Sequence, residues 1–230
     1  MIFYELWDSA KTNKIDESSF LYDFLRETDL STEVIYNGTS DDILMFVSML
    51  LSTPSDLFIE KIEENFHEIS PETIMQFSTF EHAVFSINKL IHFSNGKMTF
   101  SQLGREIMHS REEGACKKYG ENHSKLAAML GLVVLEREGS FVVKNSNFGE
   151  FSVSMSKEDK IEIIKRLALR NPFIQKIISD AKNGNCDYMV LAQQYLSEST
   201  ALRRRSNVRY IVSLVLSGTK YEYLNKNIVW

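Results

Sequence analysis

The stretch from Met98 to Asn145, MTFSQLGREIMHSREEGACKKYGENHSKLAAMLGLVVLEREGSFVVKN, decides the fold. Apolar residues recur at helical spacing in a short segment, Gln102–Met108, and in a longer one from about Ala115 to Leu130. Gly131 follows the longer segment directly, in the position where glycine commonly ends a helix. Two apolar runs then surround a Gly139-Ser140 turn, so the sequence predicts two helices followed by a β-hairpin.

The residues on either side complete this pattern. A helix is predicted from Thr79 to Ile91, where Ser94-Asn95-Gly96 ends it. The strands of the hairpin are predicted at Leu132–Arg137 and Phe141–Lys144. In this order of elements, and above all in the phrase LGLVV followed by a polar turn and FVV, the chain from about Thr79 to Phe151 resembles the winged helix-turn-helix family. The resemblance implies a nucleic-acid-binding module, although some members of the family bind only proteins.

The charge is distributed unevenly along the 230 residues, whose net charge is −5. Residues 1–97 carry 6 Lys or Arg and 17 Asp or Glu, a net charge of −11, whereas residues 98–230 carry 20 and 14, a net charge of +6. This asymmetry indicates an acidic domain joined to one that can face phosphates, or simply acidic helices near the start of the chain. An amphipathic helix is predicted within the acidic part, from Glu17 to Glu27.

A second basic helix is predicted from about Ser197 to Ser217, with Gly218 as its end. Arg203, Arg204 and Arg205 span roughly 200° of its circumference, so they cannot all be buried. The phrase S-x-x-T-x-x-R-R that opens this helix, within residues 171–218, loosely resembles the second winged-helix unit of bacterial restriction- and defence-associated DNA-binding proteins. Two short strands, Tyr221–Leu224 and Asn227–Trp230, are expected to form a second wing.

The predicted fold is therefore mainly α with small β-hairpins. It comprises an acidic helical domain at residues 1–70, a winged helix-turn-helix at 71–155 and a second, basic winged-helix-like unit at 156–230. Ser156-Lys157-Glu158-Asp159 opens the first helix of that last unit, and Asn171-Pro172 ends it.

The predicted function is sequence-specific binding of double-stranded DNA, as a transcription regulator or as the recognition part of a restriction or defence system. Each basic helix would enter the major groove, where Lys and Arg neutralise phosphates, and the wings would flank the helix along the adjacent DNA backbone. The second helix carries the stronger signal, because the stretch Met98–Asn145 holds seven basic and six acidic residues. The residues expected to contact DNA are Lys117, Lys118, Asn122, Lys125, Arg137, Lys144, Ser199, Thr200, Arg203, Arg204, Arg205 and Arg209.

Two alternatives remain open from sequence. The basic faces could be solvated and form ion pairs with the acidic domain. The chain could instead be a protein-interaction module, whose acidic N-terminal domain and winged helices dock on a nuclease or ATPase partner. A small nuclease is a further alternative, but Glu158-Asp159-Lys160 matches a nuclease motif only in its letters, since the three residues lie at a helix start.

No catalytic motif, metal site or cofactor is expected. The five histidines have no metal-binding spacing, and His123 falls on the packing stripe of its helix. Cys116 and Cys186 are expected to be buried thiols in a reducing cytoplasm, because they form neither a disulfide framework nor a CxxC pair. The sequence contains no recognisable signal peptide and no apolar run long enough to span a bilayer, so a cytoplasmic location is expected.

Overall fold

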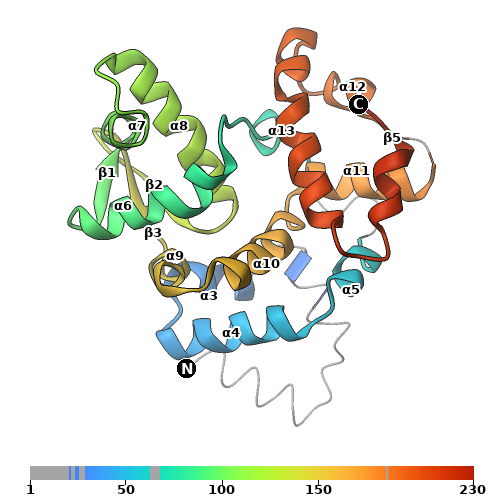
Figure 1. Ribbon diagram of the computed structural model, residues 1–230, viewed down its shortest axis with the longest axis horizontal. Helices are drawn as coiled ribbons and strands as arrows, with labels where there is room; N and C mark the ends of the chain where they lie inside the picture. Colours follow the sequence, from blue (N-terminus) through green and yellow to red (C-terminus); the bar gives the residue numbers. More distant parts are fainter. Residues whose placement is uncertain (1–20, 22–23, 26–28, 63–67, 185) are drawn as a thin grey trace. The chain divides into compact units, whose positions relative to one another are not determined.

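The computed structural model describes residues 21, 24–25, 29–62, 68–184 and 186–230, and these residues are mainly helical with a small antiparallel sheet (Figure 1). The chain divides into two compact units. Unit 1 combines the described residues up to Thr32 with Met45–Met75 and Lys165–Trp230, and unit 2 combines Glu33–Leu44 with Gln76–Ile164. This division differs from the three consecutive domains expected from sequence. The helix expected at Glu17–Glu27 lies mostly outside the described residues.

Three of the four boundaries between the units fall within helices, namely α3 (Asp29–Asn37), α4 (Ser40–Ser52) and α10 (Lys157–Ala168), and the fourth falls between Met75 and Gln76. Unit 2 otherwise follows the order of elements that the sequence predicts. Its elements are η2 (His82–Ser86, a π-helical turn), α6 (Ile87–Phe93), β1 (Lys97–Thr99), α7 (Phe100–Met108), α8 (Glu113–Met129), β2 (Val133–Glu138), β3 (Ser140–Asn145), α9 (Asn147–Phe151) and η3 (Ser152–Ser154).

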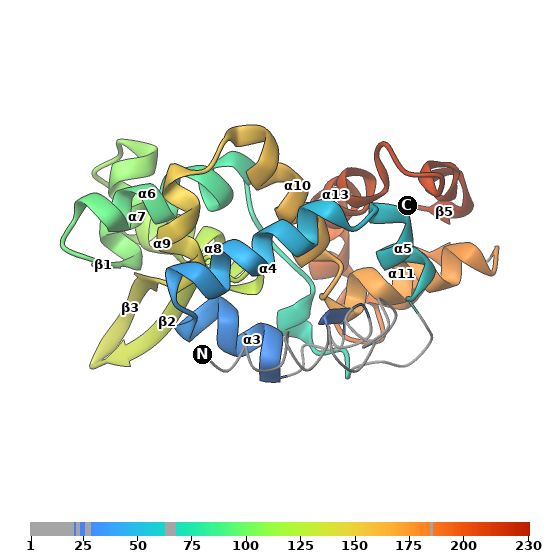
Figure 2. The same ribbon diagram turned by 90° about the horizontal axis from the view of Figure 1, so that it is seen from below.

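The sheet of unit 2 has the strand order β1-β3-β2, with both neighbouring pairs antiparallel. The predicted hairpin is confirmed, and Val143 pairs with Leu135 on one side and with Met98 on the other. Gly139 forms the turn with a φ of 74°, a conformation that glycine adopts without strain. The third strand, β1, was not predicted. In Figure 2 the β2–β3 hairpin projects beyond helices α6 and α7.

Helices α7 and α8 cross at two glycines, side by side in Figure 1. A Cβ atom on Gly104 would come within 1.8 Å of the Cys116 carbonyl oxygen, and one on Gly120 within 2.0 Å of the Phe100 carbonyl oxygen. Any side chain at these positions would therefore force the backbones apart. The crossing is fixed at its start by Thr99, which forms a capping box with Gln102 at the first turn of α7.

In the rest of unit 1, a buried polar side chain ties the start of α11 to η1. The Asn171 side chain accepts hydrogen bonds from the Phe173 and Ile174 amides at 3.0 and 3.1 Å, and donates to the Thr73 carbonyl at 2.8 Å. The remaining elements of unit 1 are α5 (Ser55–Glu60), η1 (Pro71–Thr73), α11 (Pro172–Lys182), β4 (Cys186–Asp187), α12 (Tyr188–Ala192), α13 (Glu198–Leu216), η4 (Glu222–Asn227) and β5 (Ile228–Val229).

The second wing expected at Tyr221–Leu224 and Asn227–Trp230 does not form, so this prediction is wrong. The first run lies in the 3-10 helix η4, and β5 pairs in parallel with β4 instead of returning as a hairpin. The physical reason is that the segment is bonded to neighbouring helices. The Asn227 side chain donates to the Ala181 carbonyl of α11 at 3.0 Å, and the Ser213 hydroxyl of α13 donates to the Asn225 side-chain oxygen at 3.1 Å.

We expect Gly104→Ala to lower the free energy of unfolding by about 3 kcal/mol or more, because the added methyl group has no space between the two backbones. Urea unfolding followed by circular dichroism measures the change. Gly114→Ala is the matched control within α8, since the nearest atom to its added Cβ lies at 3.4 Å. This control substitution is expected to stabilise the helix by about 0.5–1 kcal/mol. Equal effects of the two changes would show that the crossing is not tightly packed.

Candidate nucleic-acid interface

The buried face of α8 positions its basic residues outward. Cys116, Gly120, His123, Leu126 and Ala127 all point into unit 2. The intervening Lys117, Lys118 and Lys125 are exposed, as the sequence predicts for the outer face of an amphipathic helix. Asn122, also expected to contact DNA, is only partly exposed.

Glu121 engages two of these lysines. Its carboxylate lies 2.7 Å from the Lys125 ammonium and 3.4 Å from that of Lys118. The hydrogen bond from Lys125 lowers the pKa of Glu121 and so keeps the carboxylate charged. Both ion pairs lie at the solvent-exposed surface, where such pairs contribute little to stability. Lys118 and Lys125 can therefore exchange the Glu121 carboxylate for another anion.

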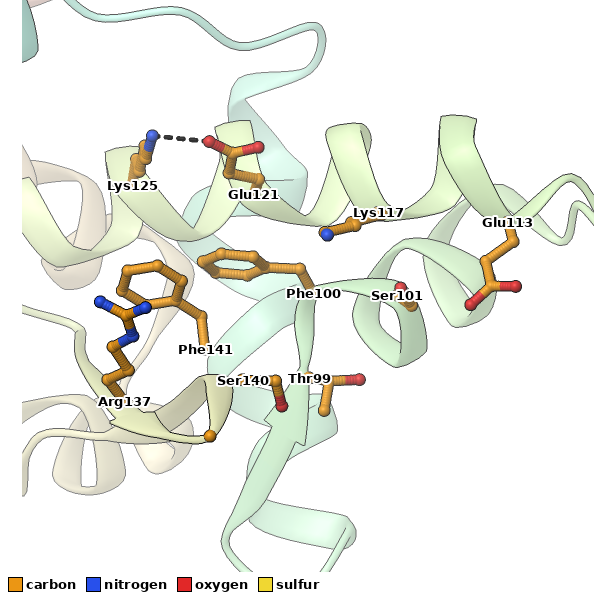
Figure 3. Close-up of a pocket in the computed structure, with 11 residues that line it drawn as sticks. Thr99, Phe100, Ser101, Glu113, Lys117, Glu121, Lys125, Arg137, Ser140 and Phe141 are labelled. Carbon is orange, nitrogen blue, oxygen red and sulfur yellow. Dashed lines mark hydrogen bonds and ion pairs between the residues drawn. The ribbon is translucent and has the colours of Figure 1, made fainter.

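A groove of about 690 Å³ lies between α8 and the turn of the β2–β3 hairpin (Figure 3). Lys117, Lys125 and Arg137 line it together with Glu113 and Glu121. Within the described part of the chain, Lys117 and Arg137 have no ion pair. The groove thus brings three of the six cationic or amide side chains predicted in this unit to one place.

Lys144 is placed differently from this expectation. Its ammonium forms an ion pair with the Glu136 carboxylate across the β2–β3 hairpin, and neither Lys144 nor Asn122 lines the groove. The two strands bring these opposite charges together on one face of the sheet. Lys144 therefore supports the hairpin in addition to any contact with a partner.

The exposed face of α13 carries a second group of cations. Arg203 and Arg209 are exposed and Arg205 is partly exposed, while Glu198 is the acidic residue of the helix. The opposite face buries apolar side chains against unit 1. These are Ala201, Val208, Ile211, Val212, Val215 and Leu216.

Hydroxyl groups lie at the start of α13, as the sequence predicts. Ser199 is exposed and Thr200 partly exposed. The Ser197 hydroxyl donates to the Thr200 hydroxyl oxygen at 3.0 Å and lies 3.4 Å from that of Ser199. The Ser197 side chain makes no capping hydrogen bond to the helix.

Arg204, also expected to contact DNA, differs from the exposed Arg203 and Arg209 because its guanidinium is bonded within unit 1. Its guanidinium donates to the Pro71 and Ile74 carbonyl oxygens at 2.8 and 2.5 Å. Burial lowers the pKa of Arg204. Helical geometry explains the difference, since Arg204 projects between its two neighbours toward the packed side of α13. Its role is to hold the segment around η1 against the helix.

A histidine–tyrosine cluster lies on the inner side of α8. His123 is fully buried, at 0% exposure, which confirms its place on the packing stripe. Its Nε2 atom accepts from the Ser78 and Thr79 amides at 3.3 and 3.1 Å, and its Nδ1 atom donates to the Tyr119 carbonyl at 2.8 Å. Burial lowers the pKa of His123, so the ring is neutral near pH 7.

Neither a cluster of metal-ligating side chains nor a membrane-spanning helix is present among the described residues. Among them, no group of three or more His, Cys, Asp or Glu is arranged to hold a metal ion, and no helix is long and apolar enough to cross a membrane. Glu158 and Asp159 lie exposed at the start of α10. Lys160 next to them is buried, with its ammonium over the Phe85 ring. Burial lowers the pKa of Lys160 to about 8.

The aromatic part of the groove was not predicted. Phe141, directly after the hairpin turn, stacks on Phe100 with ring centroids 5.6 Å apart and an interplanar angle of 20°. The available signal was an aromatic residue at the first position after Gly139-Ser140, where a polar residue is more usual.

Replacing Arg204 tests its structural role. We expect Arg204→Ala to lower the free energy of unfolding by about 2 kcal/mol, because two charge-assisted hydrogen bonds to the Pro71 and Ile74 carbonyls are lost. Arg203→Ala, one position away on the exposed face, is expected to change stability by less than about 0.5 kcal/mol. Urea unfolding of both variants measures the difference, and similar effects would contradict the assignment.

His123 predicts a pH dependence of stability. The unfolded chain binds a proton below pH 6.5, whereas the folded chain, with its lower His123 pKa, does not. The stability that neutral His123 contributes is therefore fully present above this pH and falls as the pH drops below it. Thermal unfolding at pH 7.5 and 5.5 measures it. His123→Gln is expected to reduce the dependence, whereas His109→Asn, at an exposed site, is expected to leave it unchanged.

The described residues thus form two basic surfaces, one on each of the helices α8 and α13. The α8 groove comprises Lys117, Lys125, Arg137 and the Phe100–Phe141 pair, and the α13 face comprises Arg203, Arg205 and Arg209. Arg204 and Lys144 instead form contacts within the fold, with the Pro71 carbonyl and the Glu136 carboxylate respectively.

No protein-family model, curated protein or solved structure matches this chain.

Proposed function

We propose that this chain binds double-stranded DNA, with unit 2 acting as a winged helix-turn-helix and α13 acting as a second basic helix. The observation that carries the proposal is the α8 groove. It combines a solvent-facing helix with a projecting hairpin, and cations of both elements line the same hollow. Cations on both elements suit a binding mode in which the helix enters the major groove and the hairpin lies on the adjacent DNA backbone.

The order of elements supports the same proposal for unit 2. Helix α6, strand β1, helices α7 and α8, and the β2–β3 hairpin follow one another as in winged helix-turn-helix domains. In that arrangement α8 is the recognition helix, and its outward lysines reach phosphates or guanine edges. Sequence specificity, as a regulator or as the recognition part of a restriction or defence system, is part of the proposal.

The α13 face supports a second contact. Its three arginines include two that are exposed, and an arginine is always charged at neutral pH and matches phosphate geometry. Ser199 and Thr200 at the start of the same helix add hydroxyl donors near the positive end of its dipole. The contact needs no contribution from Arg204.

A protein partner is the second candidate, and apolar residues on α13 favour it. Leu202 is 52% exposed and Tyr210 is 43% exposed, on the same side of the helix as Arg203 and Arg209. Exposed apolar groups within a polar rim are typical of protein interfaces. A nuclease or ATPase subunit would then dock on this face.

Charge substitution on each surface tests DNA binding. We expect Arg203→Gln/Arg209→Gln, and separately Lys117→Gln/Arg137→Gln, to weaken binding to a mixed-sequence duplex. Each lost phosphate contact is expected to flatten the slope of log affinity against log salt concentration by about 0.9, so each pair by about 2. Fluorescence anisotropy between about 50 and 300 mM salt measures both quantities.

The control is Lys89→Gln/Lys226→Gln, which removes the same charge from exposed positions outside both surfaces. It is expected to leave the slope unchanged. If the wild-type chain fails to bind duplex DNA at about 50 mM salt, the protein-partner candidate is favoured. If all three double variants weaken binding equally, binding depends on net charge alone and the two surfaces are not specific contacts.

A further inference from the structure

One feature of the α8 groove is not explained by contact with duplex DNA. The Phe141 side chain is 50% exposed, although it stacks on the buried Phe100 ring. Single exposed apolar side chains are normal on protein surfaces. Phe141 differs because its ring lines a groove of about 690 Å³, a size typical of sites that enclose small ligands.

The charges are arranged along the groove with one sign at each end. Figure 3 places Phe141 between Arg137 and Phe100, whereas Glu113 lies at the end far from Arg137. Lys117 points into the middle of the groove from α8. Glu121 also lines the groove between Lys125 and Lys117, and it is paired with Lys125. An anion is therefore attracted most to the Arg137 end and repelled from the Glu113 end.

We propose that the α8 groove binds an unpaired nucleotide at the end of a DNA strand, with its base on Phe141 and its phosphate beside Arg137 at the basic end. This inference rests on the proposed binding of DNA. Within a duplex, neighbouring base pairs cover both faces of each internal base, so a side-chain ring reaches a base face only at a duplex end or where the base is unpaired. Stacking of bases on aromatic side chains is a general mode of binding single strands.

The acidic end of the groove limits the ligand to a short one. A continuous single strand carries a phosphate at every nucleotide, and Glu113 disfavours a phosphate beside it. One unpaired nucleotide places its phosphate at the basic end alone. The structure thus favours a DNA end with a short overhang over a long single strand.

Two DNA probes of identical duplex sequence test the proposal. One is closed at each end by a non-nucleotide linker, so that it has no unpaired base and no free strand end, and the other carries a short overhang that contains the fluorescent base 2-aminopurine. We expect the wild-type chain to bind the overhang probe about tenfold more tightly. Binding is also expected to quench the 2-aminopurine fluorescence, because the base stacks on Phe141.

Phe141→Leu retains an apolar side chain but removes the ring face, and Phe141→Trp retains a ring. The Leu variant is expected to bind the two probes with equal affinity and to lose the quenching. The Trp variant is expected to keep the tighter binding of the overhang probe and the quenching. Thermal unfolding verifies that each variant is folded, because Phe141 also contacts Phe100.

The outcomes separate this inference from the proposed function. Salt-dependent binding of both probes with equal affinity overturns the nucleotide site and leaves DNA binding intact. Unchanged behaviour of the Leu variant overturns the role of Phe141. If neither probe binds but the free monophosphate of 2-aminopurine riboside is quenched, the groove takes a mononucleotide, and both the strand-end proposal and DNA binding are overturned.

Discussion

The close crossing of α7 and α8 is the constraint on which unit 2 depends. At Gly104 and Gly120 one helix meets the backbone carbonyl of the other without an intervening side chain. This contact sets how deeply α8 lies in the unit, and therefore which of its residues face outward. It also sets the position of Phe100, whose carbonyl faces Gly120 and whose ring supports Phe141. The groove therefore depends on glycine, which has no side chain, at both position 104 and position 120.

Much of unit 2 could be predicted because its elements are long enough for periodicity to be read. The two helices and the hairpin between Phe100 and Asn145 agree with the prediction to within two residues at each end. Strand β1 has three residues, too few for an alternating pattern. The glycine crossing depends on tertiary proximity, so Gly104 carried no signal in the sequence.

The C-terminal part shows where short patterns fail. The run from Tyr221 to Leu224 alternates in a way that suits a strand, yet it forms η4. Hydrogen bonds to α11 and α13 decide the outcome, and they join residues that the local sequence does not connect. In the candidate site, the Glu121 pairs with Lys118 and Lys125 follow from helical spacing, whereas the Arg204 bond to Pro71 spans 133 positions and does not.

The division of the chain into interleaved units has a consequence for the order of folding. Unit 2 is complete once residue 164 has been synthesised, whereas unit 1 requires segments that lie before and after it. Domains commonly fold as units during synthesis, and contacts between distant segments form slowly. Unit 2 can therefore fold on the ribosome while Met45–Met75 still awaits α11 and α13. During that interval the apolar side chains of this segment, among them Phe58 and Ile59, lack their final packing and would be the sites that a chaperone recognises.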